Sequence, residues 1–411
     1  MKDRTARQIW RGVIVLVVLA AVLVLTACGP AADFEEKAVE FTAILPITGA
    51  AGAEVQVTHL GCSDYVTDFN EQEGIPGVRV KYTWSDTGRQ LFLFLSQYEK
   101  AVERGVPVMF TLEADGLRVL EDRFAKDEIV ALADGGGFED VMYSPGWRYC
   151  QGPSTAEQFA LVADYLMENW NEPRPPRLAF VVVDIEWGRE VLIEGTEYAE
   201  SLGFEILPTE IVGVVVLDAT TQLVRLREEQ ADIVYLQALP SSGMGPILRD
   251  AERLGLLDEM QFIGTETGMG DKLIGMTGTA SEGFLMAMIT PWFEETEVPG
   301  VRLMLDSQMK YRGKVERETG YRNGFVVSAV ACEAIKQAID NVGYENVDGA
   351  AIKEALDNME DFDVHGLASI TYRDRPFDHR GITQAAVHQV QDGKIVRLSD
   401  WQELPKLWTE R

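Results

Sequence analysis

Short apolar segments alternate with helix-like segments along most of the chain, and this alternation restricts the possible folds more than any other feature. In the first repeat, an apolar run over residues 41–45 ends at Pro46, a Gly-rich loop covers 48–52, and helical spacing then continues to Asn70. An unbroken apolar run is typical of a strand buried on both faces of a parallel sheet. Strands that alternate with helices predict an α/β fold.

Two cycles of this pattern follow each other, near residues 41–150 and 153–290. Further strand-like segments are expected at 78–84, 106–111, 129–133, 177–183, 206–216, 232–236, 261–264 and 282–289. Ser154 and Glu157 form a capping-box pattern, which predicts that a helix starts there. The last third differs, with helical patterns over 303–342 and 350–359 and a hairpin signal at Gln391 to Lys394.

The N-terminus has the features of an export signal. Residues 1–11 are basic, residues 13–25 form a continuous apolar run, and Leu25, Thr26, Ala27 and Cys28 come next. The apolar run is too short for a comfortable transmembrane helix, which needs about 20 residues. The four residues that end it resemble a bacterial lipobox, which implies cleavage before Cys28 and lipidation of its sulfur. An unlipidated signal peptide and a single anchor helix are the alternatives.

The charge of the chain excludes some partners. The formal net charge is −29, so the protein repels nucleic-acid phosphates and anionic lipid headgroups. We therefore expect no nucleic-acid partner, and membrane attachment through acyl chains on Cys28 rather than through charge.

Cysteines and histidines give no metal-binding pattern, so we expect no metal and no cofactor. An exported protein can keep disulfides, and Cys62 could pair with Cys150. The sequence alone leaves that pairing open, and Cys332 is interpreted as a buried thiol.

Several motifs, in order from about residue 41 to 396, resemble the type I solute-binding lipoproteins of ABC importers, in particular the branched-chain amino-acid (Leu/Ile/Val) binding family. They are ILPITG at 44–49, DFNEQEGIPG at 68–77, Asp86, ADGGG at 133–137, the loop from Asp184 to Gly188, ADIVYLQ at 231–237, LRDAERLGL at 248–256, FIGTETG at 262–268 and DGKIV at 392–396. Each motif is degenerate, and the ordered set carries the resemblance.

The resemblance implies a fold of two Rossmann-like lobes with parallel sheets, joined by a three-crossover hinge. Residues 1–27 would be the signal peptide and 28–40 the lipidated Cys28 with its tether. The first lobe would comprise 41–152 plus 290–362, and the second 153–289 plus 363–411. Function would follow from hinge closure on a ligand between the lobes.

The resemblance also implies ligand-binding positions. These fall on Glu54, on the loop with Glu113, Ala114 and Asp115, on Gly135, Gly136 and Gly137, and on Trp187, Gln237 and Glu266. Glu266 matches the acid that accepts a ligand ammonium in the family. The loop at Glu113 departs from the family, which has a serine-rich loop for the ligand carboxylate, because carboxylates there repel a carboxylate.

The sequence therefore predicts a monomeric, lipid-anchored binding receptor, without catalytic residues, that delivers a small solute to an ABC permease. The solute is expected to be amine-bearing, amide-like or neutral polar rather than leucine or valine. A ligand-sensing lipoprotein of a signalling system and a lipoprotein hydrolase with paired carboxylates are the alternatives.

Overall fold

A computed structural model describes residues 37–49, 52–134, 142–143, 146–237, 239–373 and 377–407, and the chain from Ala38 onward forms one compact unit. The predictions for residues 1–36, which include the signal sequence and Cys28, lie outside the described residues, as do those for Gly135, Gly136 and Gly137. Within the described residues, no helix has the length and apolar character needed to cross a bilayer.

The first sheet is parallel throughout, in the order β2-β1-β3-β4-β5. Its strands are β1 (Ala38–Leu45), β2 (Arg79–Asp86), β3 (Val108–Thr111), β4 (Val130–Ala133) and β5 (Arg148–Cys150). The helices that follow these strands are α2 (Gly52–Glu71), α3 (Leu91–Glu103), α4 (Ala114–Val119) and α5 (Glu121–Asp127). The central strands β3 and β4 are buried along their whole length, as expected for a parallel sheet covered on both faces.

The second sheet runs β15-β14-β11-β10-β9-β6-β7, with β8 also paired to β6 and β16 to β14. Its strands are β6 (Arg177–Val183), β7 (Glu205–Ile206), β8 (Glu210–Val212), β9 (Ile233–Leu236), β10 (Gln261–Thr265), β11 (Leu285–Met288), β14 (Gln384–Gln391), β15 (Lys394–Arg397) and β16 (Gln402–Glu403). The predicted parallel pairing holds from β7 to β11, whereas β14 and β15 form an antiparallel edge.

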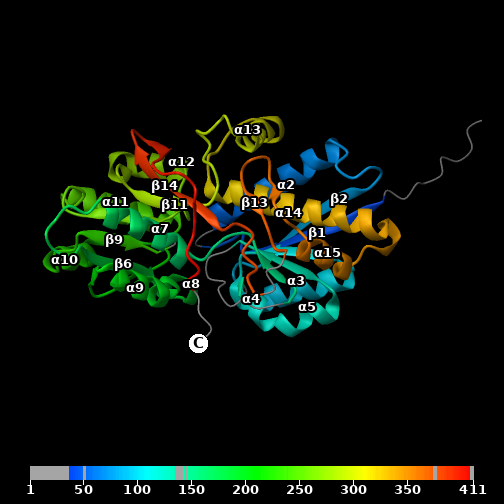
Figure 1. The fold of residues 1–411 in the computed structure, drawn as a ribbon, viewed down its shortest axis with the longest axis horizontal. Coiled ribbons are helices and arrows are strands. Elements are labelled where there is room, and N and C mark those ends of the chain that lie inside the picture. Colours follow the sequence, from blue (N-terminus) through cyan, green and yellow to red (C-terminus); the bar gives the residue numbers. More distant parts are fainter. Residues whose placement is uncertain are drawn as a thin grey trace, which may run out of the picture. The chain divides into compact units, whose positions relative to one another are not determined.

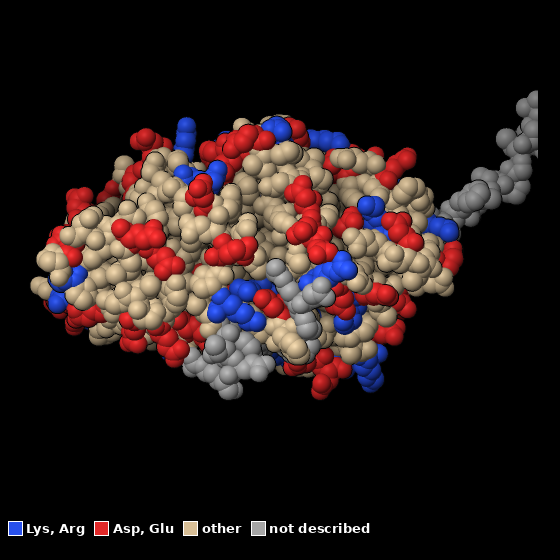
Figure 2. All heavy atoms as spheres, in the orientation of Figure 1, with Lys and Arg blue, Asp and Glu red and all other residues tan. Residues whose placement is uncertain are grey.

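Helices flank the second sheet as well, and the fold is therefore the predicted α/β arrangement of two lobes (Figure 1). These helices are α7 (Thr155–Glu168), α8 (Glu186–Arg189), α9 (Val191–Leu202), α10 (Thr220–Glu228), α11 (Ser241–Arg253), α12 (Asp271–Thr277) and the 3-10 turn η1 (Gly278–Ser281). Acidic side chains are spread over the face drawn in Figure 2, in keeping with the net charge of −29.

The last third of the chain returns to both lobes. After β11 it forms α13 (Pro299–Arg312), α14 (Thr319–Val342), η2 (Tyr344–Asn346), α15 (Gly349–Asp357) and the small hairpin of β12 (Phe362–Asp363) and β13 (Ser369–Ile370). Figure 1 shows α14 beside α2, far from it in sequence. A Cβ on Gly61 or Gly324 would come within about 2.1 Å of backbone oxygen on the facing helix, so glycine permits this close contact.

Three connections pass between the sheets: from β5 to α7, from β11 to α13, and from β13 to β14. The first and third lie side by side, because Cys150 and Arg380 form an isolated parallel bridge and Ile382 N donates to Gln151 O at 2.8 Å. The residues at which each lobe begins and ends stay a prediction.

Two local predictions are confirmed and two need correction. The capping box is present, with Ser154 and Glu157 each accepting from the other's backbone N–H, and the Gln391–Lys394 hairpin forms with Asp392 and Gly393 at positive φ. The single strand expected over 206–216 is wrong: β7 and β8 replace it, since Pro208 between them has no N–H to donate to a ladder. The helical stretch over 303–342 is divided at Gly313, which lies at φ 70.

The disulfide considered between Cys62 and Cys150 is not formed. Cys62 is a buried thiol on α2 beside Ser328 and Tyr82, and burial raises its pKa to about 12. Cys150 lies at the end of β5, where the first and third connections meet, and it belongs to a different hydrophobic cluster. Cys332 is a buried thiol, as expected.

Candidate functional site

A cavity lies between the two lobes, at the carboxyl ends of their parallel strands. Its volume is about 450 Å3, and it is lined from the first lobe by the segments after β1, β3 and β4 and from the second lobe by those after β6 and β10. The start of α14 forms a third side. Loops and helix N-termini converge at this edge of an open α/β sheet, which is why ligands bind there.

Most of the side chains predicted from the sequence come together in this cavity. Glu54 on the first turn of α2, the Glu113, Ala114 and Asp115 loop, Trp187 on α8 and Glu266 after β10 all line it. Gln237 does not line it. This side chain lies behind the wall, where its Nε2 donates to Thr155 Oγ1 at 2.9 Å and to the Trp187 backbone oxygen at 3.2 Å. Whether each residue contacts a ligand stays a prediction.

Among the described residues that line the cavity, carboxylates outnumber cations. The acidic residues that line it are Glu54, Glu113, Asp115, Asp134, Glu266 and Glu318, and the basic ones are Arg89 and Arg118. Glu318 stabilises the start of α12, because its Oε1 accepts a hydrogen bond from Lys272 N at 2.9 Å. Burial raises the pKa of Glu318 to about 7.

Glu113 lies in the loop for which the resemblance predicts the position of the ligand carboxylate. Its side chain is buried, and Thr87 Oγ1 donates to it at 2.6 Å. Burial raises the pKa of Glu113. An acidic group held here repels an anionic ligand group, so the departure seen in the sequence persists in the site.

Glu266 is engaged by the protein itself. The guanidinium of Arg322 on α14 forms an ion pair with its carboxylate, and Ile289 N donates to the same oxygen at 3.2 Å. Arg322 is completely buried and also donates to Thr290 O at 3.1 Å, with its guanidinium 5.2 Å from the centre of the Trp292 ring. This buried pair joins an element of the first lobe to a loop of the second.

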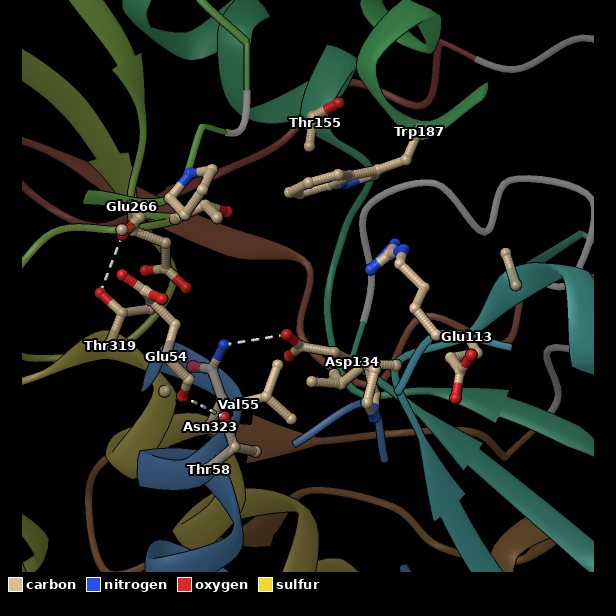
Figure 3. A pocket seen from close by; sticks show the side chains of 18 of the residues that line it. Glu54, Val55, Thr58, Glu113, Asp134, Thr155, Trp187, Glu266, Thr319 and Asn323 are labelled. Atoms are coloured by element: carbon tan, nitrogen blue, oxygen red, sulfur yellow. Dashed lines mark hydrogen bonds between the residues drawn. The ribbon is translucent and has the colours of Figure 1, made fainter. Parts of the chain in front are cut away.

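Asp134 lies at the centre of the site, directly after β4. Asn323 Nδ2 on α14 donates to its carboxylate at 3.1 Å (Figure 3). Burial raises the pKa of Asp134 to about 6, and the nearby charge of Glu266 acts in the same direction. Trp187 projects into the open space from the second lobe, across from Asp134, Val55 and Thr58 (Figure 3).

Sequence reasoning missed part of the site. Asp134 belongs to the ADGGG motif but was not chosen, whereas Asn323, Thr319 and Gln158 carried no signal. They lie inside the helices α14 and α7, and only the packing of these helices at the cavity gives them a role. The described residues hold no cluster of His, Cys, Asp or Glu with metal-binding geometry.

A family model described as "Periplasmic binding protein" matches residues 38–394. The chain belongs to the periplasmic binding protein family. The family's members are extracytoplasmic substrate-binding proteins of ABC transporters rather than enzymes. No curated protein matches the sequence.

Solved structures similar to this binding protein share its fold. A branched-chain amino-acid ABC transporter protein from Thermus thermophilus with bound valine is 23% identical, with a TM-score of 0.82 over 90% of this chain and 97% of that one. A fatty acid ABC transporter substrate-binding protein from Thermomonospora curvata is 17% identical, with a TM-score of 0.76, over 90% and 93% of the two chains.

A third similar structure is a solute-binding protein from Rhodopseudomonas palustris BisB5 in complex with 3,4-dihydroxy benzoic acid. It is 15% identical, with a TM-score of 0.73, over 90% of this chain and 98% of that one. Because the ligands in these titles differ so widely, the shared fold does not define the ligand of this binding protein.

Proposed function

We propose that this binding protein is a lipid-anchored receptor that delivers a small N–H-bearing solute, an amine or an amide, to the permease of an ABC importer. The observation that carries the proposal is the charge of the cleft: among the residues that the structure describes, six acidic ones line the cavity against two arginines. Such a surface attracts positive charge and hydrogen-bond donors, and it repels the carboxylate that an amino acid would bring.

The size of the cleft supports a small ligand. A cavity of about 450 Å3 lies within the roughly 300–1,000 Å3 typical of small-molecule sites. Trp187 offers an aromatic face to an apolar or cationic part of the ligand.

Both lobes contribute lining residues, so a ligand held between them favours a closed arrangement. A permease that recognises this arrangement could distinguish loaded from empty protein.

Support for the anchor comes from the sequence. Leu25, Thr26, Ala27 and Cys28 follow an apolar run of export-signal length. Acyl chains contribute about 0.8 kcal/mol per buried CH2, enough to hold a strongly acidic protein at an anionic membrane surface. Labelling cells with a radioactive fatty acid tests this part, with Cys28→Ala as the control that loses the label.

Calorimetry tests the ligand class. Purified protein is titrated with amines and amides of several sizes, and with leucine, isoleucine and valine. We expect submillimolar binding within the first group and none within the second. Submillimolar binding of any of the three amino acids would overturn the proposal.

A further inference from the structure

The carboxylates of the cleft differ in their partners, and this difference separates structural acids from acids that can serve a ligand. Glu54 pairs with Lys272 at 3.0 Å, Asp115 with Arg118 at 3.7 Å, and Glu266 with Arg322. Each of these negative charges is offset by a side chain of the protein. Their capacity to attract a ligand cation is correspondingly reduced.

Glu266 is the residue that the family resemblance assigns to a ligand ammonium, and its surroundings argue against that role. Arg322 and Glu266 are both buried, and each supplies the other's opposite charge. Separating them would leave an uncompensated buried charge, which is strongly unfavourable. A ligand ammonium would therefore have to compete with a guanidinium that the fold already holds in place.

Asp134 is different. Among the described residues, no lysine or arginine forms an ion pair with it, and its hydrogen-bond donor is the neutral amide of Asn323 at 3.1 Å. Its side chain is partly exposed and lines the cavity. The carboxylate is thus directed at the cleft with a negative charge that no neighbouring cation neutralises in direct contact.

Two buried acceptors in the same cavity lack donors. Asn323 Oδ1 and Gln158 Oε1 have no hydrogen-bond partner within the described part of the chain, although Asn323 is only 7% exposed and Gln158 only 6%. Buried polar atoms are rarely left without a partner, because the lost hydration is costly. A ligand with several N–H groups would donate to both oxygens, of which one belongs to each lobe.

Together these groups define one ligand chemistry. We propose that Asp134, rather than Glu266, is the anionic anchor of the cleft, and that it binds the protonated nitrogen of an organic ammonium, amidinium or guanidinium ligand whose N–H groups also reach Asn323 Oδ1 and Gln158 Oε1. This inference rests on the proposed function and narrows it to cations. A quaternary ammonium is a poor ligand, since it has no N–H to donate. The carbon skeleton of the ligand lies against Trp187.

The test compares probes that differ in one property. Benzylamine and agmatine carry protonated N–H groups, benzyltrimethylammonium carries the charge without N–H, and benzyl alcohol carries neither. Calorimetry with the mature chain at pH 8 should give submillimolar binding for at least one protonated probe. Benzyltrimethylammonium and benzyl alcohol should bind at least about tenfold more weakly than benzylamine, in line with one charge-assisted hydrogen bond.

Substitutions then test whether Asp134 is the group that binds the ligand cation. Asp134→Asn should weaken binding of the protonated probe about 10- to 100-fold, as loss of one charge-assisted contact does. Asp164→Asn is the matched control, because Asp164 on α7 is likewise a partly buried acid, the Tyr198 hydroxyl donates to it at 2.9 Å, and it does not line the cavity. We expect the control to retain wild-type affinity.

A pH profile of the wild type gives a readout that needs no variant. The charged groups facing Asp134 are Glu266 after β10 and Arg322 on α14, while Glu54, Glu113 and Glu318 line the same cavity. Affinity for a protonated probe should fall severalfold between pH 8 and pH 5 as Asp134 takes up a proton, and the profile of Asp134→Asn should be flatter.

Each outcome has a defined meaning. Wild-type affinity in Asp134→Asn, or equal binding of benzyltrimethylammonium and benzylamine, shows that Asp134 is not the group that binds the ligand cation. The proposed function stays intact in that case. The same holds if neutral amides bind while no protonated probe does. Submillimolar binding of leucine, isoleucine or valine overturns both.

Discussion

The Nζ atom of Lys272 on α12 lies 3.0 Å from the carboxylate of Glu54 on α2, so an ion pair connects the two lobes beside the cleft. Ser241 on α11 donates to the same carboxylate. Both contacts run from the second lobe to the first, and both would be lost if the lobes separated.

We expect Lys272→Met to loosen the closed arrangement. The pair is partly exposed, with 41% of the lysine side chain accessible, so its loss should cost about 0–1 kcal/mol. Ligand dissociation measured by stopped flow should become up to about fivefold faster, with little change in thermal stability. Lys336→Met is the matched control, since Lys336 pairs with Glu333 within α14 at 3.3 Å. Equal ligand dissociation rates in both variants would show that the ion pair of Glu54 and Lys272 does not stabilise the closed arrangement.

The buried pair of Glu266 and Arg322 should matter for stability. Glu266→Gln or Arg322→Met alone leaves one charge buried without its partner, which costs about 3–5 kcal/mol. Urea unfolding measures this loss. The double variant should lose less than the two single variants combined, because neither charge remains. Additive losses would show that the two residues act independently.

The carboxylate of Asp134 should lower the free energy of unfolding at neutral pH. Its pKa is about 6 in the folded protein against 3.8 ordinarily, so its contribution is most favourable below pH 3.8 and is lost as pH rises through 6. Asp134→Asn should therefore be more stable than the wild type at pH 8 by on the order of 1–3 kcal/mol, with the difference smallest near pH 4.

Urea unfolding at both pH values checks this prediction for Asp134. Asp306→Asn, at an exposed position of α13, serves as the control. If Asp134→Asn is the less stable protein at pH 8, the hydrogen bond from Asn323 outweighs the desolvation of the carboxylate.

Trp187→Ala should weaken binding of an organic cation by about 3- to 30-fold, as expected from loss of a cation–π contact of roughly 0.5–2 kcal/mol. The ring lines the cavity, and α8 carries it. Trp84→Ala is a suitable control because Trp84 on β2 is 49% exposed and does not line the cavity. Tryptophan fluorescence and calorimetry both report the effect, and unchanged affinity in Trp187→Ala would exclude stacking.

The thiols of Cys62 and Cys332 should resist alkylation in the native protein. Burial raises the pKa of Cys62 to about 12, so the reactive thiolate is scarce at pH 8. Mass spectrometry after iodoacetamide treatment should show labelling of both residues only in denaturant. An intact mass that rises on reduction would instead reveal a disulfide.

Local features were predictable because neighbouring residues decide them. The capping box at Ser154, the hairpin at Asp392 and Gly393, and the parallel strand at 41–45 depend on contacts within a few residues, or on a burial pattern visible in the run itself. The errors at 206–216 and at 303–342 also have local causes, at Pro208 and Gly313.

The family resemblance placed Glu54, Glu113, Trp187 and Glu266 near the ligand, and the topology explains why they meet at the cleft. Each follows a parallel strand, and the carboxyl ends of parallel strands meet at one edge. What each carboxylate does there was not predictable, because its charge depends on partners from other segments.

By itself, the sequence determined the α/β class, the order of the strands along the chain, the acidic character of the protein and the set of loops that can reach a ligand. Only the tertiary structure decided that Arg322 neutralises Glu266 and that Asn323 holds Asp134 toward the cavity. These partners lie 56 and 189 residues apart in the chain, and they meet because α14 returns to pack on α2. Pairing at such separations depends on the path of the chain between the lobes. The residues beside each partner do not determine that path, so they cannot reveal the pair.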